Sequence, residues 1–262
     1  HMTALGFGLS PVFMRGSGFS FLDIADLVAH WDSSAGLTKD GGGSPGDGDR
    51  ITSWVDRVAS YDMLQATEAK MPTLDVAAGV QSVEFDGVDD LLRCNAAALL
   101  SALNTAVGTL VVVYEYDTLA DFKTVCSASD EATSNNQLVL YGYRNAAQPN
   151  IAWYHSDAGS ADNLHGSTTV VVNTKTLGIL ASSGTAYSVR VNGTDDTETV
   201  VGGSNSGDWY ADISAGFDSL VLGADNKNAT ASSFFPGKIY DVALYSRELT
   251  AVEIALIEDN YP

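Results

Sequence analysis

Apolar residues recur along most of the chain in short runs, and polar turn residues interrupt them at intervals of roughly 10–15 positions. The runs are rich in Val, Ile, Tyr and Trp, which favour strands over helices. Asn-Gly, Asp-Gly and similar breakers separate them, which predicts an antiparallel β-sandwich. The clearest predicted strands are residues 109–117, 122–129, 137–144, 151–156, 167–173, 176–182, 187–191, 198–203, 219–224 and 237–245.

The segment "YSVRVNG" predicts a β-hairpin. Residues 187–191 alternate between apolar and polar side chains, so one face of this strand is apolar. Asn192-Gly193 follows, and these residue types accept the positive φ angles of a type I′ turn. The next strand is therefore expected to return alongside the first.

Short helices are predicted in the middle and at the end of the chain. Residues 95–103 form an Ala- and Leu-rich run of helical length. Thr250 and Glu253 have the spacing of a capping box, in which each side chain accepts a backbone N–H of the other residue. The apolar face of this C-terminal helix would consist of Val252, Leu256 and Ile257.

The first 25 residues differ from the rest of the chain. The run "LGFGLSPVFMRGSGFSF" combines glycines, which disfavour regular structure, with phenylalanines, which favour burial. We therefore divide the chain into an N-terminal arm, residues 1–25, and one domain, residues 26–262. The arm would pack on its own domain or on a partner, in a homo-oligomer or a particle. His1 is interpreted as a remnant of an expression vector, and the start lacks the pattern of a secretory signal.

Five segments of the chain form an ordered series of motifs. They are "LVAHWDSSAG", "ITSWVDRVASYDMLQATEAKMPTL", "VEFDGVDDLL", "YSVRVNG" and "FPGKIYDVALYSRELTAVEIALI". Over about residues 26–260 the chain thereby resembles laminin-G-like, concanavalin A-like lectin–glucanase proteins, in particular their bacterial and phage branch. The resemblance implies an all-β fold, an antiparallel jelly-roll β-sandwich with a short C-terminal helix. Members include lectins, adhesion modules, accessory modules of glycan-degrading enzymes, hydrolases and lyases, so the fold alone does not fix the function.

The charge of the chain narrows its partners. Thirteen basic against 33 acidic residues give a net charge of −20 and a pI near 4.2. Such a surface repels nucleic acids and anionic membranes, so neither is expected as a partner. No apolar run approaches the roughly 18 residues of a membrane span. The acidity suits solubility in a salty medium, or else some carboxylates hold Ca²⁺.

The two cysteines, Cys94 and Cys126, are too few for a disulfide framework. We expect two free, half-buried thiols, with a single bridge as the alternative.

The stretch "VEFDGVDDLL", residues 83–92, admits three interpretations: a catalytic acid/base cluster, a calcium site or a polar turn. The resemblance implies that hydrolases of this fold carry Glu-x-Asp-x-x-Glu on one strand. Here Asp89 stands in place of the last Glu and Gly87 breaks the strand, so no catalytic residue is assigned. Calcium is the possible cofactor, because it binds six to eight oxygens. The predicted metal ligands are Asp86, Asp89 and Asp90, with solvated turn carboxylates as the alternative.

Aromatic and polar residues of two strands and one loop are candidates for ligand contact, since sugars are bound by aromatic rings and convergent polar groups. Tyr141 and Tyr143 are expected to share one face of strand 137–144. Trp153 and His155 are expected to share a face of the following strand. The alternative is that these rings pack in the core. The predicted ligand-binding residues are Tyr141, Tyr143, Arg144, Trp153, His155 and Trp209.

These observations predict a non-catalytic, lectin-like module that binds a polysaccharide or surface glycan. The arm and the missing secretory signal favour an extracellular or virion-associated adhesion or receptor-binding component of a phage-like particle. A glycan-degrading enzyme, either a polysaccharide lyase or a glycoside hydrolase, is the first alternative, because Tyr143, Arg144 and His155 would suit a lyase. A structural protein–protein module is the second.

Overall fold

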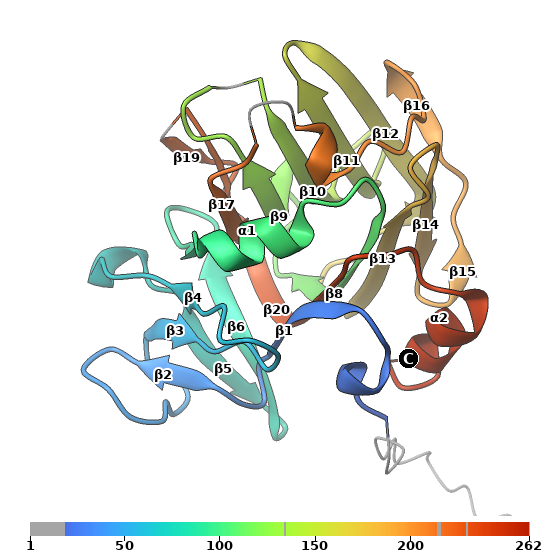
Figure 1. The fold of residues 1–262 in the computed structure, drawn as a ribbon. Helices are drawn as coiled ribbons and strands as arrows, with labels where there is room; N and C mark the ends of the chain where they lie inside the picture. Colours follow the sequence, from blue (N-terminus) through green and yellow to red (C-terminus); the bar gives the residue numbers. More distant parts are fainter. Residues whose placement is uncertain (1–18, 134, 214–215, 229, 262) are drawn as a thin grey trace, which may run out of the picture.

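Two antiparallel β-sheets face each other in the computed structural model, which describes residues 19–133, 135–213, 216–228 and 230–261 (Figure 1). The strands of the first sheet, sheet A, are β1 (Leu27–Asp32), β5 (Thr73–Ala77), β6 (Val80–Asp86), β8 (Gly108–Tyr116), β13 (Thr176–Ser182), β14 (Tyr187–Val191), β15 (Thr194–Asp195) and β20 (Pro236–Tyr245). Their order is β15-β14-β13-β8-β20-β6-β5. β1 and β6 pair with successive halves of β20, so both lie along one of its edges.

The second sheet, sheet B, has the order β16-β12-β11-β10-β9-β17-β7-β4-β3-β2. Its strands are β2 (Leu37–Lys39), β3 (Ile51–Trp54), β4 (Met63–Leu64), β7 (Leu92–Cys94), β9 (Lys123–Ser129), β10 (Gln137–Tyr143), β11 (Asn150–Asp157), β12 (Ser160–Thr169), β16 (Thr199–Gly202) and β17 (Ser219–Leu222). The remaining elements are the hairpin β18 (Asp225–Lys227) and β19 (Thr230–Ser232), the helices α1 (Ala97–Leu103) and α2 (Ala251–Glu258), and the 3₁₀ turns η1 (Phe21–Asp23), η2 (Glu68–Lys70) and η3 (Tyr210–Asp212).

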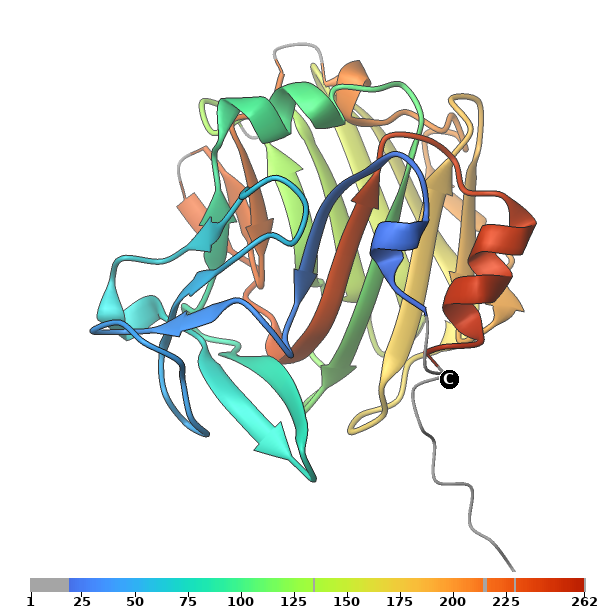
Figure 2. The same ribbon diagram turned by 60° about the horizontal axis from the view of Figure 1, so that its bottom comes forward.

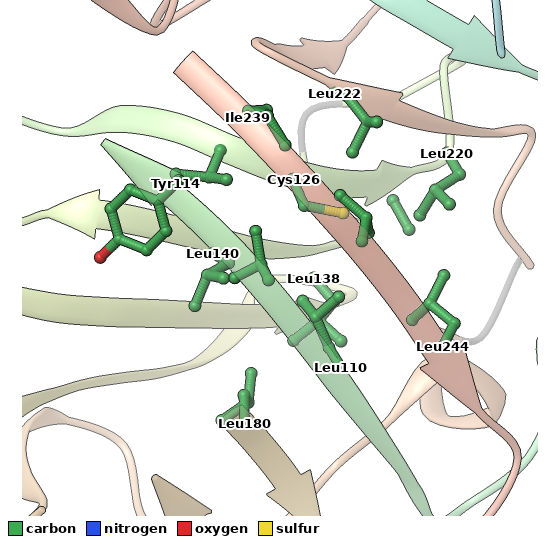
Figure 3. Packing of buried hydrophobic residues seen from close by; sticks show 14 of the residues in the cluster. Leu110, Tyr114, Cys126, Leu138, Leu140, Leu180, Leu220, Leu222, Ile239 and Leu244 are labelled. Atoms are coloured by element: carbon green, nitrogen blue, oxygen red, sulfur yellow. The ribbon is translucent and has the colours of Figure 1, made fainter. Parts of the chain in front are cut away.

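Side chains of both sheets fill the space between them (Figure 3). Sheet A contributes Leu110 and Tyr114 from β8, and sheet B contributes Leu138 and Leu140 from β10. The indole rings are also inside, since Trp31, Trp54, Trp153 and Trp209 are all fully buried. Burying one large aromatic ring is worth about 4–6 kcal/mol of gross transfer free energy, so these rings supply much of the driving force for folding.

A second apolar layer covers the outer face of sheet A. There η1 and α2 lie over the strands, as Figure 2 shows in blue and red. Phe21 and Ile257 are buried against this face, and Tyr261 stacks on Phe21 with ring centroids 5.2 Å apart. Arg190 of β14 fastens the helix, because its Nε and Nη2 donate to the two carboxylate oxygens of Glu258 at 2.6 and 3.0 Å. The described ends of the chain therefore meet on one face.

The structure confirms the predicted all-β, antiparallel jelly-roll sandwich with a short C-terminal helix. The hairpin turn is present, since Asn192 and Gly193 have φ angles of 49° and 79°. The capping box is present as well, with the Thr250 N–H donating to Glu253 Oε2 at 2.9 Å. Residues 1–18 of the predicted arm lie outside the described residues, whereas Phe21 and Ile24 pack on the domain.

Two local predictions are wrong. The strand expected at 167–173 is instead β12, which ends at Thr169 and leaves Val171 and Val172 exposed in the following turn. The apolar face of α2 is not the expected one, because Val252 and Leu256 are exposed and only Ile257 of the three is buried. Apolar side chains alone did not show which side of a short helix meets the sheet.

Both cysteines, Cys94 and Cys126, are free, as the low cysteine count indicated, but they are fully buried and not half-buried as expected. Burial raises the pKa of the Cys126 thiol to about 12, so it stays protonated and unreactive at neutral pH. Among the described residues no helix is long and apolar enough to cross a bilayer.

Candidate ligand-binding site

A polar hollow of about 290 Å³ lies at the end of the sandwich where β11 turns into β12. We call it the His155 hollow; its lining residues are His155, Asp157, Ser160, Ala161, Asp162, Asp208 and Asp212. Its volume is just below the roughly 300–1,000 Å³ of pockets for drug-sized ligands, which suits a ligand of one or two rings.

Strand register places the hollow. His155 pairs directly with Asp162 across the β11–β12 hairpin, so the two side chains leave the sheet on the same face. Trp153 lies on that face two residues earlier and is in the core. At His155 the apolar core gives way to the loop that follows β16. The strand therefore delivers a polar side chain where the packed interior ends.

His155 itself is buried, with 2% of its surface exposed. Its Nδ1 lies 3.7 Å from Asp208 Oδ2, and its Nε2 has no hydrogen-bond partner among the described residues. Burial lowers the pKa of His155, and the surrounding carboxylates, led by Asp208, oppose this only in part. The imidazole is therefore neutral at pH 7, and its unpaired Nε2 is closed off from solvent.

The loop 203–206 closes one wall of the hollow. Asp162 Oδ1 accepts the backbone N–H of Ser204 at 2.7 Å, and Asp162 Oδ2 accepts the Ser206 hydroxyl. Gly203 makes this approach feasible: its φ is +72°, and a Cβ there would lie 2.2 Å from the Ala161 carbonyl oxygen. The residue has to be glycine for steric reasons as well as backbone ones.

Two carboxylates keep acceptor capacity for a ligand. Asp212 Oδ2 accepts the Trp209 N–H at 2.7 Å, which leaves Oδ1 of the same group. Asp208 is the more open one, with 43% of its side chain exposed beside His155. Convergent acceptors around a neutral imidazole suit a ligand that carries several hydroxyl or N–H donors.

The predicted metal ligands also come together, in the turn after β6. One oxygen of each of Asp86, Asp89 and Asp90 lies within 4.8 Å of the others. Asp86 Oδ1 accepts the N–H groups of Val88, Asp89 and Asp90 at 2.8, 3.2 and 3.4 Å, and Asp90 Oδ2 accepts the Asp86 N–H at 3.0 Å. Gly87, with φ +73°, makes the turn as the sequence indicated. Carboxylates thus cap the turn and still offer oxygens on its surface.

Asp90 is the perturbed member of this turn. Burial raises its pKa to about 7; the Asp86 N–H lowers it, and the charges of Asp86 and Asp89 raise it further. Three clustered hard oxygen donors fit Ca²⁺, with water completing the six to eight ligands that the ion takes. A bound cation would favour the ionised form of Asp90, which burial and the neighbouring carboxylates disfavour.

Two acidic segments, "EFD" at residues 84–86 and "EYD" at residues 115–117, meet beside this turn. Glu84 of β6 and Asp117, which follows β8, both line a hollow of about 430 Å³ together with Asp90. The pKa of Glu84 is raised by burial, lowered by Lys238 and raised by Asp117. The two segments are far apart in the sequence, and β20 brings them together because it lies between β6 and β8.

Three predicted ligand-binding residues belong to the core instead. Trp153 and Trp209 are fully buried, and Tyr143 is buried against Tyr116 with ring centroids 6.1 Å apart. The structure therefore contradicts their assignment to a ligand surface, and the alternative of core packing holds for them. Their burial follows from the width of the sandwich, which large rings fill.

Tyr141 and Arg144 lie elsewhere. Tyr141 faces away from the core, and its ring lies against that of Phe122 with centroids 5.7 Å apart. It therefore does not share a face with Tyr143. The register shifts between Leu140 and Tyr143 are the reason, because each irregularity turns later side chains over. Arg144 is buried and donates to Gln148. Of the six predicted residues, only His155 lines the hollow.

The sequence reasoning missed most residues of the hollow. Asp208 and Asp212 lie on either side of Trp209 in "SGDWYAD", but only Trp209 was predicted to contact a ligand. Asp162 could have been found from a two-residue turn at Ala158-Gly159, where Gly159 accepts a positive φ angle. Such a turn pairs Asp157 with Ser160 and therefore His155 with Asp162.

The family model described as the concanavalin A-like lectin/glucanases superfamily matches residues 103–255. The chain belongs to this superfamily. No curated protein matches it.

Solved structures similar to this superfamily member include several sialidase components. The CBM40 of the Ruminococcus gnavus IT-sialidase, bound to α2,3-sialyllactose, aligns with a TM-score of 0.57 and 15% identity over 68% of this chain and 95% of that one. The Trypanosoma rangeli sialidase in complex with sialic acid gives 0.59 and 17% over 90% of this chain and 33% of that one. The K499G mutant of the NanB sialidase of Streptococcus pneumoniae aligns with a TM-score of 0.54 and 18% identity, over 66% of this chain and 27% of that one. At these identities the likeness shows a shared fold.

Proposed function

We propose that this protein is a non-catalytic carbohydrate-binding module and that the His155 hollow is where it holds its ligand. One observation carries the proposal: the hollow is open and its polar groups are mainly acceptors, with the Asp208 side chain 43% exposed beside the buried His155 ring. The superfamily contains lectins, and one structural neighbour was solved with a bound sialyllactose, which supports a sugar as the ligand class.

The chemistry of the hollow matches sugar recognition. A sugar offers many O–H donors on a rigid ring, and the carboxylates of Asp208 and Asp212 accept such bonds strongly because they are charged. Trp153 Nε1 and Trp209 Nε1 also lack partners, but they lie in the apolar core, whereas the His155 ring lines the hollow.

The test is a glycan array followed by titration calorimetry on each hit. Replacing Asp208 by Asn removes one charged acceptor from the open wall and is expected to weaken binding about tenfold. Asp40→Asn, an equal charge change in the exposed loop 40–49, is the matched control and is expected to bind as the wild type does. Hits whose affinity is the same in both variants would place the ligand elsewhere and refute this site.

Calcium binding by Asp86, Asp89 and Asp90 is a second part of the proposal. The clustering of their oxygens and the raised pKa of Asp90 support it. Calorimetric titration of EDTA-treated protein with CaCl₂ is expected to show one site that Asp86→Ala removes. A wild-type protein that releases no heat and gains no thermal stability in millimolar calcium does not use the turn in this way.

We further propose the setting of an extracellular or virion-associated adhesion component of a phage-like particle, attached by the N-terminal arm or self-associated through it. Because Phe21 is buried on the domain, an informative truncation removes residues 2–18 only. That variant is expected to keep its melting temperature and lose particle incorporation or self-association in light scattering. Normal assembly of the truncated chain would rule out the anchor.

Glycan degradation remains the second candidate function, and the pairing of Glu84 with Asp117 favours it. A glycoside hydrolase needs one protonated and one ionised carboxyl group, and the raised pKa of Glu84 suits the acid. Reducing-end assays on neutral and acidic polysaccharides decide the matter. Turnover that Glu84→Gln abolishes would replace the lectin proposal by this one.

A further inference from the structure

We infer that the outer face of sheet A holds a docking groove for the N-terminal arm of the same chain. A groove of about 650 Å³ lies on this face, and we call it the Tyr240 groove. The arm segment that we assign to it is residues 3–18, which lie outside the described residues. The walls of the groove include Ser33, Val80, Val113, Tyr240, Asn260 and Tyr261.

The groove borders the second apolar layer of the protein. Val113, Tyr240 and Tyr261 belong to the layer that packs under η1 and α2. The Tyr240 hydroxyl donates to Glu115 Oε2 at 3.1 Å, which fixes the ring in the wall. Val80, at the start of β6, leaves 47% of its surface exposed. The apolar layer therefore continues into an open groove, where an apolar segment can still be buried.

The path of the chain leads to this groove. The ring of Phe19, the first described residue, lies edge-on to Tyr261 with centroids 6.3 Å apart, and Tyr261 lines the groove. At about 3.3 Å per residue, residues 3–18 extend over roughly 50 Å, far more than a groove of this volume requires. A segment tethered at the edge of its binding site has an effective concentration of order millimolar. The arm of the same chain is therefore favoured over that of a second copy.

The composition of the arm suits an apolar groove. Leu5, Phe7, Leu9 and Phe13 all gain from leaving water. In an extended segment Leu5, Phe7 and Leu9 would lie on one face, because alternate side chains point to opposite sides. The glycines between them would let the backbone approach the domain closely.

The charge of the arm is a separate reason for the assignment. Arg15 is the only Asp, Glu, Lys or Arg among residues 3–18, whereas the whole chain has a net charge of −20. Asp241 is buried in the groove wall, and Lys175, which also lines the groove, has its Nζ 4.1 Å from the centroid of the Tyr240 ring. The acidic domain as a whole therefore attracts a cationic, apolar arm. An arm held in this way has to leave the groove before it can join a second protein.

The test uses the full chain with Ser10→Cys and a nitroxide label on the new thiol. Cys94 and Cys126 are buried, so the label reacts at position 10. We expect the label to reduce the amide signals of Val80 and Gln81 at least twofold relative to the same sample after reduction with ascorbate. A mixture of labelled ¹⁴N chain with unlabelled ¹⁵N chain should show no such loss, because each arm docks on its own domain.

Two variants locate the contact. Val80→Lys places a long cation in the wall and should abolish the signal loss, whereas Val200→Lys, at a Val of sheet B with a similar 43% exposure, should not. Phe7→Ser combined with Phe13→Ser should abolish it without changing the domain. Full signals at Gln81 in the labelled protein, or a loss that survives Val80→Lys, would overturn the inference. A loss confined to the mixed sample would overturn it too, because the arm would then dock on another copy.

Discussion

Replacement of Asp90 by Asn gives the sharpest test of the electrostatics at the Asp86–Asp90 turn. In the wild type Asp90 Oδ2 accepts a hydrogen bond from the Asp86 N–H at 3.0 Å. Asn keeps an oxygen that can accept this bond, and it removes the charge that burial disfavours. The pKa of Asp90 is about 7 in the folded chain against 3.8 for an ordinary Asp. In the unfolded chain the group is ionised above pH 4, whereas in the folded chain it keeps its proton up to about pH 7. The folded state therefore loses stability as pH rises through this window.

The magnitude follows from the same two pKa values. At about 1.4 kcal/mol per pH unit, the difference corresponds to an upper bound of about 4 kcal/mol above pH 7. Because the carboxyl borders an open hollow, solvent screening reduces this, and we expect Asp90→Asn to stabilise the protein by roughly 1–2 kcal/mol at pH 8. For a chain of this size that is a rise of about 2–8 °C in melting temperature.

The assay is thermal unfolding in EDTA at pH 4.5, 6 and 8, with Asp89→Asn as the control. Asp89 lies in the same turn, carries the same charge and is less buried. The gain from Asp90→Asn should be near zero at pH 4.5 and largest at pH 8. A variant that is less stable than the wild type at pH 8 in EDTA, or a gain independent of pH, would refute the reasoning.

Calcium should make the wild type more stable than the Asp90→Asn variant, the reverse of the order expected in EDTA. When a cation binds the turn, the ionised Asp90 becomes favourable, and a ligand at 100 times its dissociation constant adds about 2.7 kcal/mol to the wild type. The Asn variant should gain much less, since it has lost a charged oxygen. Equal responses of the two proteins to calcium would exclude the turn as the binding site while leaving the pKa argument intact.

Three further predictions concern the hollow and the C-terminal helix. Gly203→Ala should cost about 1–3 kcal/mol and weaken ligand binding, since a Cβ would lie 2.2 Å from Asp162 Oδ1 at a φ of +72°, whereas Gly202→Ala has open space and should be neutral in the same melts. The pKa of His155 is lowered in the folded protein, so on acidification the unfolded state binds the proton first and the wild type should lose stability as pH falls below 6.5. His155→Gln should make the melting temperature less dependent on pH between 7.5 and 5.5, and parallel profiles of the two proteins would contradict this. Arg190→Ala removes the paired bonds to Glu258 and should cost about 1 kcal/mol and speed hydrogen exchange in α2, with unchanged exchange as the contrary result.

The sequence was a good guide wherever the signal is local. Asn192-Gly193 and the Thr250–Glu253 box each depend on residues within four positions, and both appear as expected. It was a poor guide to the faces of strands, since the alternation of side chains does not reveal a bulge. Tyr141 and Tyr143 were assigned together for this reason, and the irregular pairing of β10 with β9 separates them.

The His155 hollow could not be predicted from the sequence, because strand pairing and a loop bring together segments that are about 50 residues apart in the chain. Its residues were visible individually, but aromatic rings attracted the functional interpretation and carboxylates were interpreted as surface charge. The structure reverses this assignment: Trp153 and Trp209 hold the core, and the acidic residues beside them form the hollow.

This reversal also explains why one end of the sandwich can carry a polar site at all. A buried ring nitrogen without a partner costs about 1–3 kcal/mol, which a chain of marginal stability does not tolerate without compensation. The packed core, which reaches His155 through Leu138, Leu140 and the ring of Trp153, supplies that compensation by burying apolar surface. The core therefore supplies the stability that lets a polar ring stand at the end of β11, beside the aspartates of the hollow.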